Sequence, residues 1–184
     1  IDDKEIPRKA RRTMSRMSLF AVNASKEALA DGGLGLSVAG SGRLGCVIGS
    51  TMGSSASLND AFEAMLPSKD LSNMTSSQFF RCISHTAVMN VSQYLGITGC
   101  VIAPSAACAS GLQAVGIGYD LIRLGKQDMA LCGGAEELHP TVTGSFDVLF
   151  ATSCRYNDEP QKTPRPFDAD RDGLGDSCDS LPDM

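Results

Sequence analysis

The stretch Val101-Ile-Ala-Pro-Ser-Ala-Ala-Cys-Ala-Ser-Gly111 is the strongest structural signal in this 184-residue chain. Val101 and Ile102 are β-branched and predict a short buried strand, which a proline ends. Ala- and Leu-rich sequence then continues to Leu124 and predicts a helix. A second short apolar run follows and ends at Gly134. This order of strand, sharp turn, helix and strand indicates an α/β fold.

Apolar residues fall on nearly every side of the predicted helix from Ala107 to Leu124, so we expect this helix to be buried. Cys108 would then lie in its first turn. Unpaired backbone N–H groups and the positive end of the helix dipole favour a thiolate there, and the same N–H groups can bind an oxyanion. From position alone, a nucleophile and a small buried hydrophobic residue explain Cys108 equally well.

Three motifs occur in a fixed order: Ser105-Ala-Ala-Cys-Ala-Ser-Gly111, Gly133-Gly-Ala-Glu136 and Pro164-Arg-Pro-Phe-Asp-Ala-Asp-Arg-Asp-Gly173. In order and spacing the chain resembles the β-ketoacyl-(acyl-carrier-protein) synthases, the decarboxylating condensing enzymes of fatty-acid and polyketide synthesis. The resemblance implies the layered α/β/α fold of the thiolase-like superfamily, present here as most of its N-terminal half. It also implies that Cys108 is the acyl-accepting nucleophile.

The resemblance covers residues 1–174 as a partial N-terminal domain of such a synthase. Relatives continue after Leu174 into a Gly-rich turn and an apolar strand, whereas residues 175–184 of this chain form an atypical tail. The chain begins at Ile1 rather than at a methionine. We therefore interpret it as a fragment with a truncated or frame-shifted end.

Composition argues against several classes of function. The net charge of −5 speaks against a nucleic-acid-binding surface, and no apolar run is long enough to span a membrane. Seven cysteines lie far apart without a Cys-x-x-Cys pair, and the chain has two histidines. We therefore expect no metal site, and free thiols in a reducing compartment, the cytoplasm. Asp168-Ala-Asp-Arg-Asp-Gly173 is superficially like a calcium loop, but no Glu follows at the bidentate position.

The beginning of the chain is basic. Apolar residues recur at three- and four-residue steps from Arg8 to Asp31 and predict one amphipathic helix, whose first part contains Arg8, Lys9, Arg11, Arg12 and Arg16. Such a run is usually a solvated face. The resemblance implies instead a docking surface for an acidic acyl carrier protein, with Lys9 and Arg12 at the matching positions.

The resemblance also implies residues that line the acyl-binding pocket. The candidates are Met52, Gly53, Ser54, Phe146 and Phe150. The first three belong to a turn that follows a predicted strand from Leu44 to Ser50. The two phenylalanines would help to form the wall of the acyl tunnel, and core packing is the competing explanation for both.

Two further polar residues have weaker interpretations. His85 lies in a predicted helix from Phe79 to Leu95, and we assign it no catalytic role. Helices at this position border the subunit interface in the family, which implies a homodimer. Glu136 either has a structural role, in which it caps or pairs with groups near the cysteine-bearing helix, or has no special role.

The implied reaction has two halves. First, a thiolate attacks an acyl thioester, and the acyl group moves to Cys108. A malonyl thioester then loses carbon dioxide, and the resulting enolate attacks the acyl group while hydrogen-bond donors stabilise its oxygen. The family supplies these donors from two histidines with a supporting lysine, and no matching pattern occurs in these residues. We therefore expect the chain to load an acyl group and not to condense it.

The same resemblance implies no resident cofactor, because phosphopantetheine arrives on the carrier protein. Two alternatives to a condensing enzyme remain open. One is a non-condensing partner subunit resembling a chain-length factor, although such subunits replace the nucleophile. The other is an inactive truncated product.

Overall fold

The computed structural model describes residues 5–66, 68–153 and 156–163. These residues belong to two compact units, Ile1–Glu137 and Leu138–Met184. The predicted turn from Pro164 to Gly173 and the predicted tail at 175–184 lie outside the described residues.

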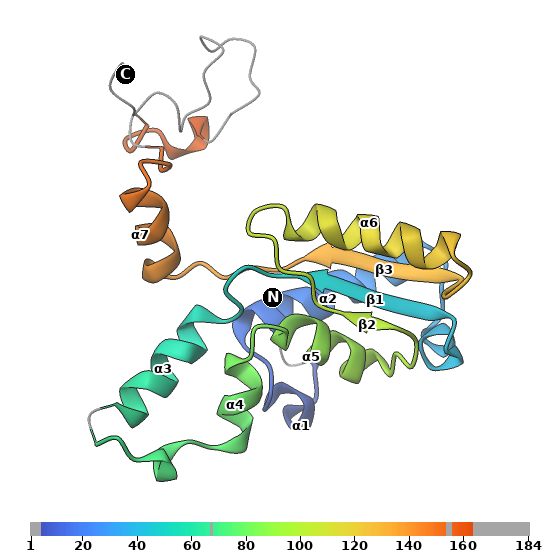
Figure 1. The fold of residues 1–184 in the computed structure, drawn as a ribbon, viewed down its shortest axis with the longest axis horizontal. Coiled ribbons are helices and arrows are strands. Elements are labelled where there is room, and N and C mark those ends of the chain that lie inside the picture. The colour runs from blue at the N-terminus through green and yellow to red at the C-terminus, as the bar shows by residue number, and fades with distance from the viewer. Residues whose placement is uncertain (1–4, 67, 154–155, 164–184) are drawn as a thin grey trace. The chain divides into compact units, whose positions relative to one another are not determined.

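The first unit is built on a parallel sheet of three strands, β1 (Leu44–Gly49), β2 (Val101–Ile102) and β3 (Met129–Gly134), in the order β2-β1-β3 (Figure 1). Val47 in the central strand lies opposite Ile102 on one side and Cys132 on the other. The α/β fold and the unit of strand, turn, helix and strand predicted from the sequence are confirmed.

Helices cover both faces of this sheet. The chain passes from β1 to β2 through α5 (Thr86–Leu95), and then returns past β1 to β3 through α6 (Ser110–Arg123). Because the direction across the sheet reverses, crossovers of one hand place these helices on opposite faces. Helix α2 (Arg16–Asp31) packs with α5, so the unit has three layers in the order α/β/α (Figure 1).

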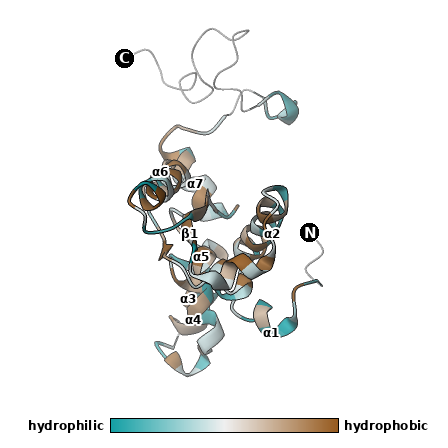
Figure 2. Cartoon of the chain, turned by 90° about the vertical axis from the view of Figure 1, so that its right-hand side faces the viewer, coloured by the Kyte–Doolittle hydropathy of each residue, from teal (hydrophilic) through white to brown (hydrophobic). Residues whose placement is uncertain are grey.

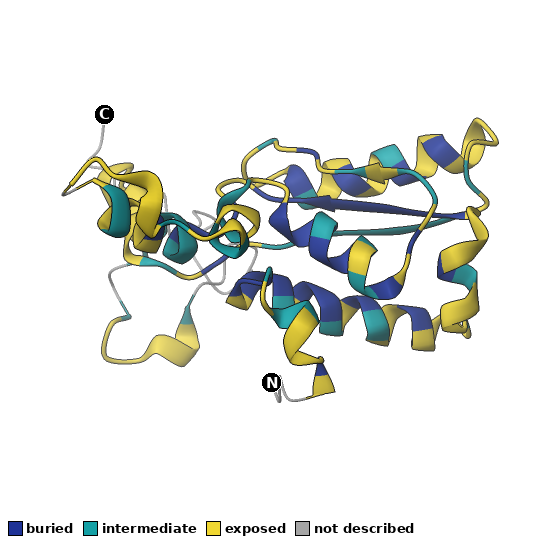
Figure 3. Cartoon of the chain, turned by 90° about the horizontal axis from the view of Figure 1, so that it is seen from below, coloured by how far each residue is buried: buried dark blue, intermediate teal, exposed yellow. Residues whose placement is uncertain are grey.

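The sequence predicts that helix α6 is buried on all sides, and this prediction is wrong. The sheet covers only one face of the helix. Ala114 and Leu121 face the sheet and are buried, whereas Leu112 and Tyr119 are 77% and 58% exposed. Several turns of α6 are hydrophobic in Figure 2, and Figure 3 shows buried positions along one strand and on the inner faces of the helices. That strand is β1, since the residues of β2 and β3 are half-buried or exposed. An apolar helix face is therefore left open to solvent.

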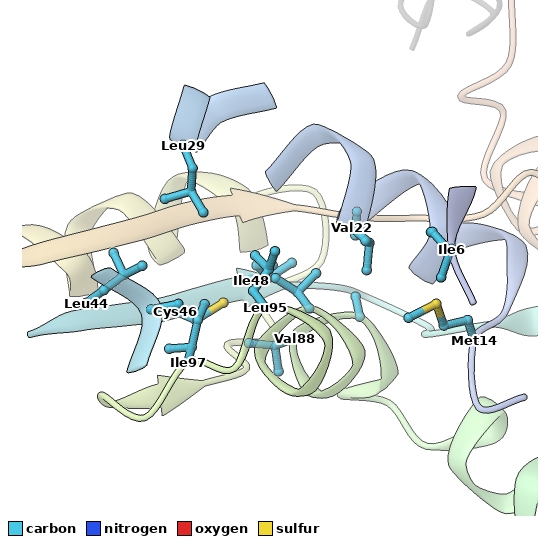
Figure 4. Close-up of a cluster of buried hydrophobic side chains, with 14 of the residues drawn as sticks. Ile6, Met14, Val22, Leu29, Leu44, Cys46, Ile48, Val88, Leu95 and Ile97 are labelled. Carbon is cyan, nitrogen blue, oxygen red and sulfur yellow. The ribbon is translucent and has the colours of Figure 1, made fainter. Parts of the chain in front are cut away.

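The core lies on both sides of β1, whose six residues are all buried. Leu44, Cys46 and Ile48 enter a large cluster with side chains from α2 and α5 (Figure 4). Val47, on the other face of the strand, packs with Ala114 and Leu121 of α6 in a smaller cluster. Alternation along one central strand thus fixes both helical layers.

The other described elements are α1 (Arg8–Arg11), η2 (Leu36–Ser41), α3 (Ser55–Met65), η3 (Leu71–Asn73), α4 (Ser76–Cys82), α7 (Pro140–Val148) and η4 (Pro160–Lys162). The last two belong to the second unit. Among the residues that the structure describes, no helix combines the length and apolar character that a membrane crossing requires.

The single helix predicted from Arg8 to Asp31 is in fact two helices, α1 and α2. Ser15 caps the second helix, because its side chain accepts a hydrogen bond from the Ser18 N–H. Thr13 lies in the break, where its hydroxyl donates to Asn90 Oδ1 at 2.7 Å. A contact with α5, far along the chain, therefore accompanies the interruption of a helix that the local pattern favours.

The helix predicted from Phe79 to Leu95 is also divided, into α4 and α5. Ile83 ends α4 with an extended backbone, at ψ 143°. His85 therefore does not lie inside a helix but immediately precedes α5. Its side chain is exposed and does not cap that helix.

We expect the two faces of α6 to respond differently to the same substitution. Leu121→Ala removes a side chain that is 8% exposed and should lower the free energy of unfolding by about 2–4 kcal/mol. Leu112→Ala, on the exposed face, should change it by less than about 0.5 kcal/mol. Urea unfolding followed by circular dichroism measures both, and equal losses would contradict the burial of one face alone.

Candidate active site

The candidate site lies at the carboxyl edge of the sheet, toward which the strand arrowheads point in Figure 1. All three strands are parallel, so the segments that follow them meet at this edge. The Ser50–Ser54 turn follows β1, the segment with Cys108 follows β2, and Glu136 and Glu137 follow β3. This is the usual place for a ligand site in an α/β sheet.

The sequence predicts that Cys108 lies in the first turn of the helix, but the structure places it before helix α6. The helix begins at Ser110, and its N-cap is Ala109. Ala107 turns the chain sharply with a φ of 49°, in the left-handed region that residues with a side chain rarely adopt. The thiol is exposed at the tip of this turn, a strained conformation of the kind that concentrates at functional sites.

The Ser110 hydroxyl stabilises this turn from inside the helix. It accepts a hydrogen bond from the Ala106 N–H at 2.8 Å and donates one to Ala107 O at 2.6 Å. Ser110 itself is buried. The conformation around Cys108 therefore depends on the position of the first residue of α6.

Glycines allow α6 to begin close to the strand ends. A Cβ on Gly49 would lie 2.5 Å from Ser110 O, and a Cβ on Gly134 would lie 3.2 Å from Gly111 Cα. Any side chain at Gly49 would therefore displace the start of the helix. The end of β1 is also joined to the segment before Cys108, because the Ser50 N–H donates to Pro104 O at 3.3 Å.

Glu136 binds the turn after β1 rather than the cysteine-bearing helix. Its Oε2 accepts hydrogen bonds from Thr51 N at 2.7 Å and Met52 N at 3.4 Å. Its Oε1 accepts a hydrogen bond from the Ser50 hydroxyl at 3.4 Å. The structural interpretation is therefore the one that the geometry supports for Glu136.

Glu137 is a buried carboxylate that the sequence interpretation does not include. Its Oε2 accepts hydrogen bonds from Ser54 Oγ at 3.0 Å and Ala56 N at 2.9 Å. A charged residue shortly after a predicted strand is the sequence signal that points to this position. The pattern does not indicate which of two neighbouring glutamates points inward.

The predicted pocket residues lie in both units. Met52 is 42% exposed, Gly53 is buried, and Ser54 is fully buried as the N-cap of α3. Phe146 in α7 and Phe150 just after it are exposed and belong to the second unit. The acyl-lining role of all five residues stays a prediction.

The basic residues gather around the break between α1 and α2. Lys9 and Arg12 are exposed, and within the described residues neither forms an ion pair with an acidic side chain. Arg81 of α4 donates from Nε to Arg12 O at 3.0 Å and so adds a cation to this surface. The sequence pattern does not indicate Arg81, because it lies 69 residues along the chain from Arg12.

Three of the other cysteines, Cys46, Cys82 and Cys132, are poor nucleophiles. Burial, together with the nearby Cys132, raises the pKa of Cys46 to about 12. Burial also raises the pKa of Cys82 and that of Cys132. Among the described cysteines, Cys108 alone is exposed. No group of His, Cys, Asp and Glu side chains in the described part of the chain is arranged to hold a metal ion.

Comparisons with known proteins agree with this geometry. The sequence profile of the family described as beta-ketoacyl synthase, N-terminal domain, matches residues 3–177. The 3-oxoacyl-(acyl-carrier-protein) synthase 1 of Haemophilus influenzae is 32% identical over 171 residues, which are 93% of this chain and 42% of that protein. The chain thus spans about two fifths of the length of this relative.

Two solved structures extend the likeness to three dimensions. A beta-ketoacyl synthase from Burkholderia phymatum is 48% identical with a TM-score of 0.79, over 92% of this chain and 41% of that one. A type II polyketide acyl-carrier protein in complex with its ketosynthase matches with 28% identity and a TM-score of 0.74, over 88% of this chain and 41% of that chain.

We expect iodoacetamide at about pH 7.5 to modify Cys108 before Cys46, Cys82 and Cys132. A raised pKa leaves less thiolate at that pH, and the thiolate is the species that reacts. As the pH is raised, the alkylation rates of Cys82 and Cys132 should therefore approach that of Cys108 at a lower pH than the rate of Cys46 does. Peptide mass spectrometry over time measures the order. The urea-unfolded chain is the control, and equal labelling of the folded chain would contradict the site.

Proposed function

The chain belongs to the β-ketoacyl synthase family, and from this premise we propose that Cys108 accepts an acyl group from a thioester. One observation is central: an exposed thiol lies at the carboxyl edge of the sheet, immediately before the amino end of α6. The chain spans 42% of the Haemophilus relative, so the activity of the whole protein is part of the proposal.

In the proposed transfer, the Cys108 thiolate attacks the acyl carbonyl carbon of the thioester. The tetrahedral oxyanion then collapses, the bond to the phosphopantetheine sulfur breaks, and that sulfur leaves and takes up a proton. None of the backbone hydrogen bonds in the described residues uses the Cys108 N–H as donor. This N–H is therefore available for the oxyanion, with the positive end of α6 beside it.

The full reaction that we propose is decarboxylative condensation of the Cys108 acyl group with a malonyl thioester on a carrier protein. The enolate needs hydrogen-bond donors, and these residues contain no match to the histidine motifs that the family uses. We assign those donors to residues outside this sequence. The 184-residue chain by itself should load an acyl group without forming a carbon–carbon bond.

A partner subunit resembling a chain-length factor is the second candidate function. Such subunits resemble synthases throughout but lack the nucleophile. The exposed Cys108 therefore favours the synthase. The relatives include enzymes of both fatty-acid and polyketide synthesis, so the proposal covers either pathway.

The proposed partner is an acidic acyl carrier protein, which docks on the surface formed by Lys9, Arg12 and Arg81. Two exposed cations, Lys9 and Arg12, and the half-buried Arg81 support this docking by charge complementarity. A solved complex of a related ketosynthase with its carrier protein supports the class of partner. Phosphopantetheine reaches the site on that carrier, and we propose no resident cofactor. The homodimer and the cytoplasmic location stay predictions.

We expect Cys108→Ala to abolish covalent acyl loading, because the acceptor atom is removed. Intact mass spectrometry after incubation with an acyl thioester measures the adduct. Cys100→Ser, at a cysteine that is not fully exposed, is the matched control and should load normally. Loading at another cysteine would contradict the assignment, and a condensed product from the 184-residue chain would contradict its limit to loading.

We expect Lys9→Glu combined with Arg12→Glu to raise the KM for an acyl-carrier protein by roughly tenfold, because charge complementarity is reversed. Loading from an uncharged acyl-N-acetylcysteamine thioester should not change. Added salt should raise the KM for the acyl-carrier protein more in the unsubstituted protein than in the variant. Lys126→Glu, at an exposed position just after α6, is the control. Equal losses with both substrates would contradict docking at this surface.

A further inference from the structure

We propose that Glu137 is a positioning residue for acyl transfer: its buried carboxylate fixes the Ser50–Ser54 turn against which the acyl group on Cys108 lies. This role rests on the proposed function of Cys108. It deepens that function, because it assigns the shape of the acyl site to a residue that contacts neither the thiol nor the acyl group.

The contacts of Glu137 hold the end of the turn and the start of α3. Its side chain is 9% exposed, and its Oε2 accepts hydrogen bonds from Ser54 Oγ and from the Ala56 N–H at 2.9–3.0 Å. Ala56 lies in the first turn of α3, where a carboxylate also interacts favourably with the helix dipole. Hydrogen bonds to a charged acceptor are stronger than neutral ones.

A cap alone does not require this carboxylate. Ser54 already caps α3, because its side chain accepts from the Ser57 N–H. Burial of a charge costs free energy unless the charge is hydrogen-bonded. The hydrogen bonds of Glu137 therefore fix the position of this helix end relative to β3, which the Ser54 cap cannot do.

The turn is fixed at its other end by the neighbouring carboxylate. Glu136 accepts from the Thr51 and Met52 N–H groups, and inside the turn the Gly53 N–H donates to Ser50 Oγ at 3.0 Å. Two consecutive glutamates thus bind opposite ends of one five-residue segment. The exposed side chain of Met52 is the apolar group that this segment presents.

The turn is connected to the backbone around Cys108. The Ala135 N–H donates to Gly49 O at 2.9 Å and joins β3 to the end of β1. The next residue, Ser50, donates to Pro104 O, four residues before Cys108. The turn and the segment with Cys108 follow neighbouring parallel strands and so reach the same edge of the sheet. Loss of the Glu137 anchor should therefore move the turn with Met52 more than the thiol itself. The effect should grow with the length of the acyl chain.

The test compares Glu137→Ala and Glu137→Gln with Glu63→Ala, in the whole protein that the gene encodes. Glu63 is the matched control, because it is an exposed glutamate of α3 whose hydrogen bond to Asn59 stays within that helix. Loading from acetyl- and dodecanoyl-N-acetylcysteamine is measured against thioester concentration. Alkylation of Cys108 by iodoacetamide reports thiol exposure separately.

We expect Glu137→Ala to raise the half-saturating concentration of the dodecanoyl thioester by about tenfold and that of the acetyl thioester by less than about threefold. Alkylation of Cys108 should stay within about twofold. Glu137→Gln retains an acceptor oxygen for the Ala56 N–H and should recover most of the loss. Glu63→Ala should behave as the unsubstituted protein.

Unchanged loading by Glu137→Ala would overturn this role. Equal losses for both thioesters and for alkylation would also overturn it, because they indicate general destabilisation. Should Glu137→Ala fail to fold, Glu137→Asp carries the test: its shorter side chain must give a weaker loss with the same dependence on chain length. Absence of loading by the unsubstituted protein would overturn the proposed function and this role together.

Discussion

The position of Cys108 depends on one steric constraint, the close approach of helix α6 to the carboxyl ends of β1 and β3. At Gly49 and at Gly134 a neighbouring backbone lies where a side chain would begin. Contacts between backbones cannot be relieved by rotating a side chain, so these glycines determine where α6 starts. Ser110 then determines the turn that presents the thiol, because it bonds to the residues on the amino side of Cys108.

The parts of the fold that depend on neighbouring residues could be predicted from the sequence. The strands around Leu44 and Val101 are short β-branched or apolar runs, and each has clear ends. The role of Cys108 as nucleophile stays a prediction, because position alone leaves it open and the family resemblance is what favours it. The location of Cys108 one residue before the N-cap was not predictable, because a local pattern does not fix a helix start to the residue.

What the sequence could not predict depends on hydrogen bonds between distant residues. Thr13 and Asn90 lie 77 residues apart, and their bond accompanies the break between α1 and α2. Glu137 and Ser54 lie 83 residues apart, and their bond anchors the turn beside the site. No periodicity contains such a pair, because each partner looks locally like an ordinary polar surface residue. The sequence therefore indicates the chemistry of the site more fully than the residues that support it.

The exposure of helix α6 bears on why we propose acyl loading for the 184-residue chain and condensation for the whole protein. Its apolar residues occupy both faces, as the sequence pattern indicates, yet the sheet of the first unit buries only the face with Ala114 and Leu121. The opposite face, with Leu112 at 77% exposure, has the composition of a surface that packs against another layer. The proposed loading step needs the thiol and the Cys108 N–H, and both are present before the start of α6. Condensation needs further donors around the same acyl group, and a second layer over this face is where residues outside this sequence could supply them.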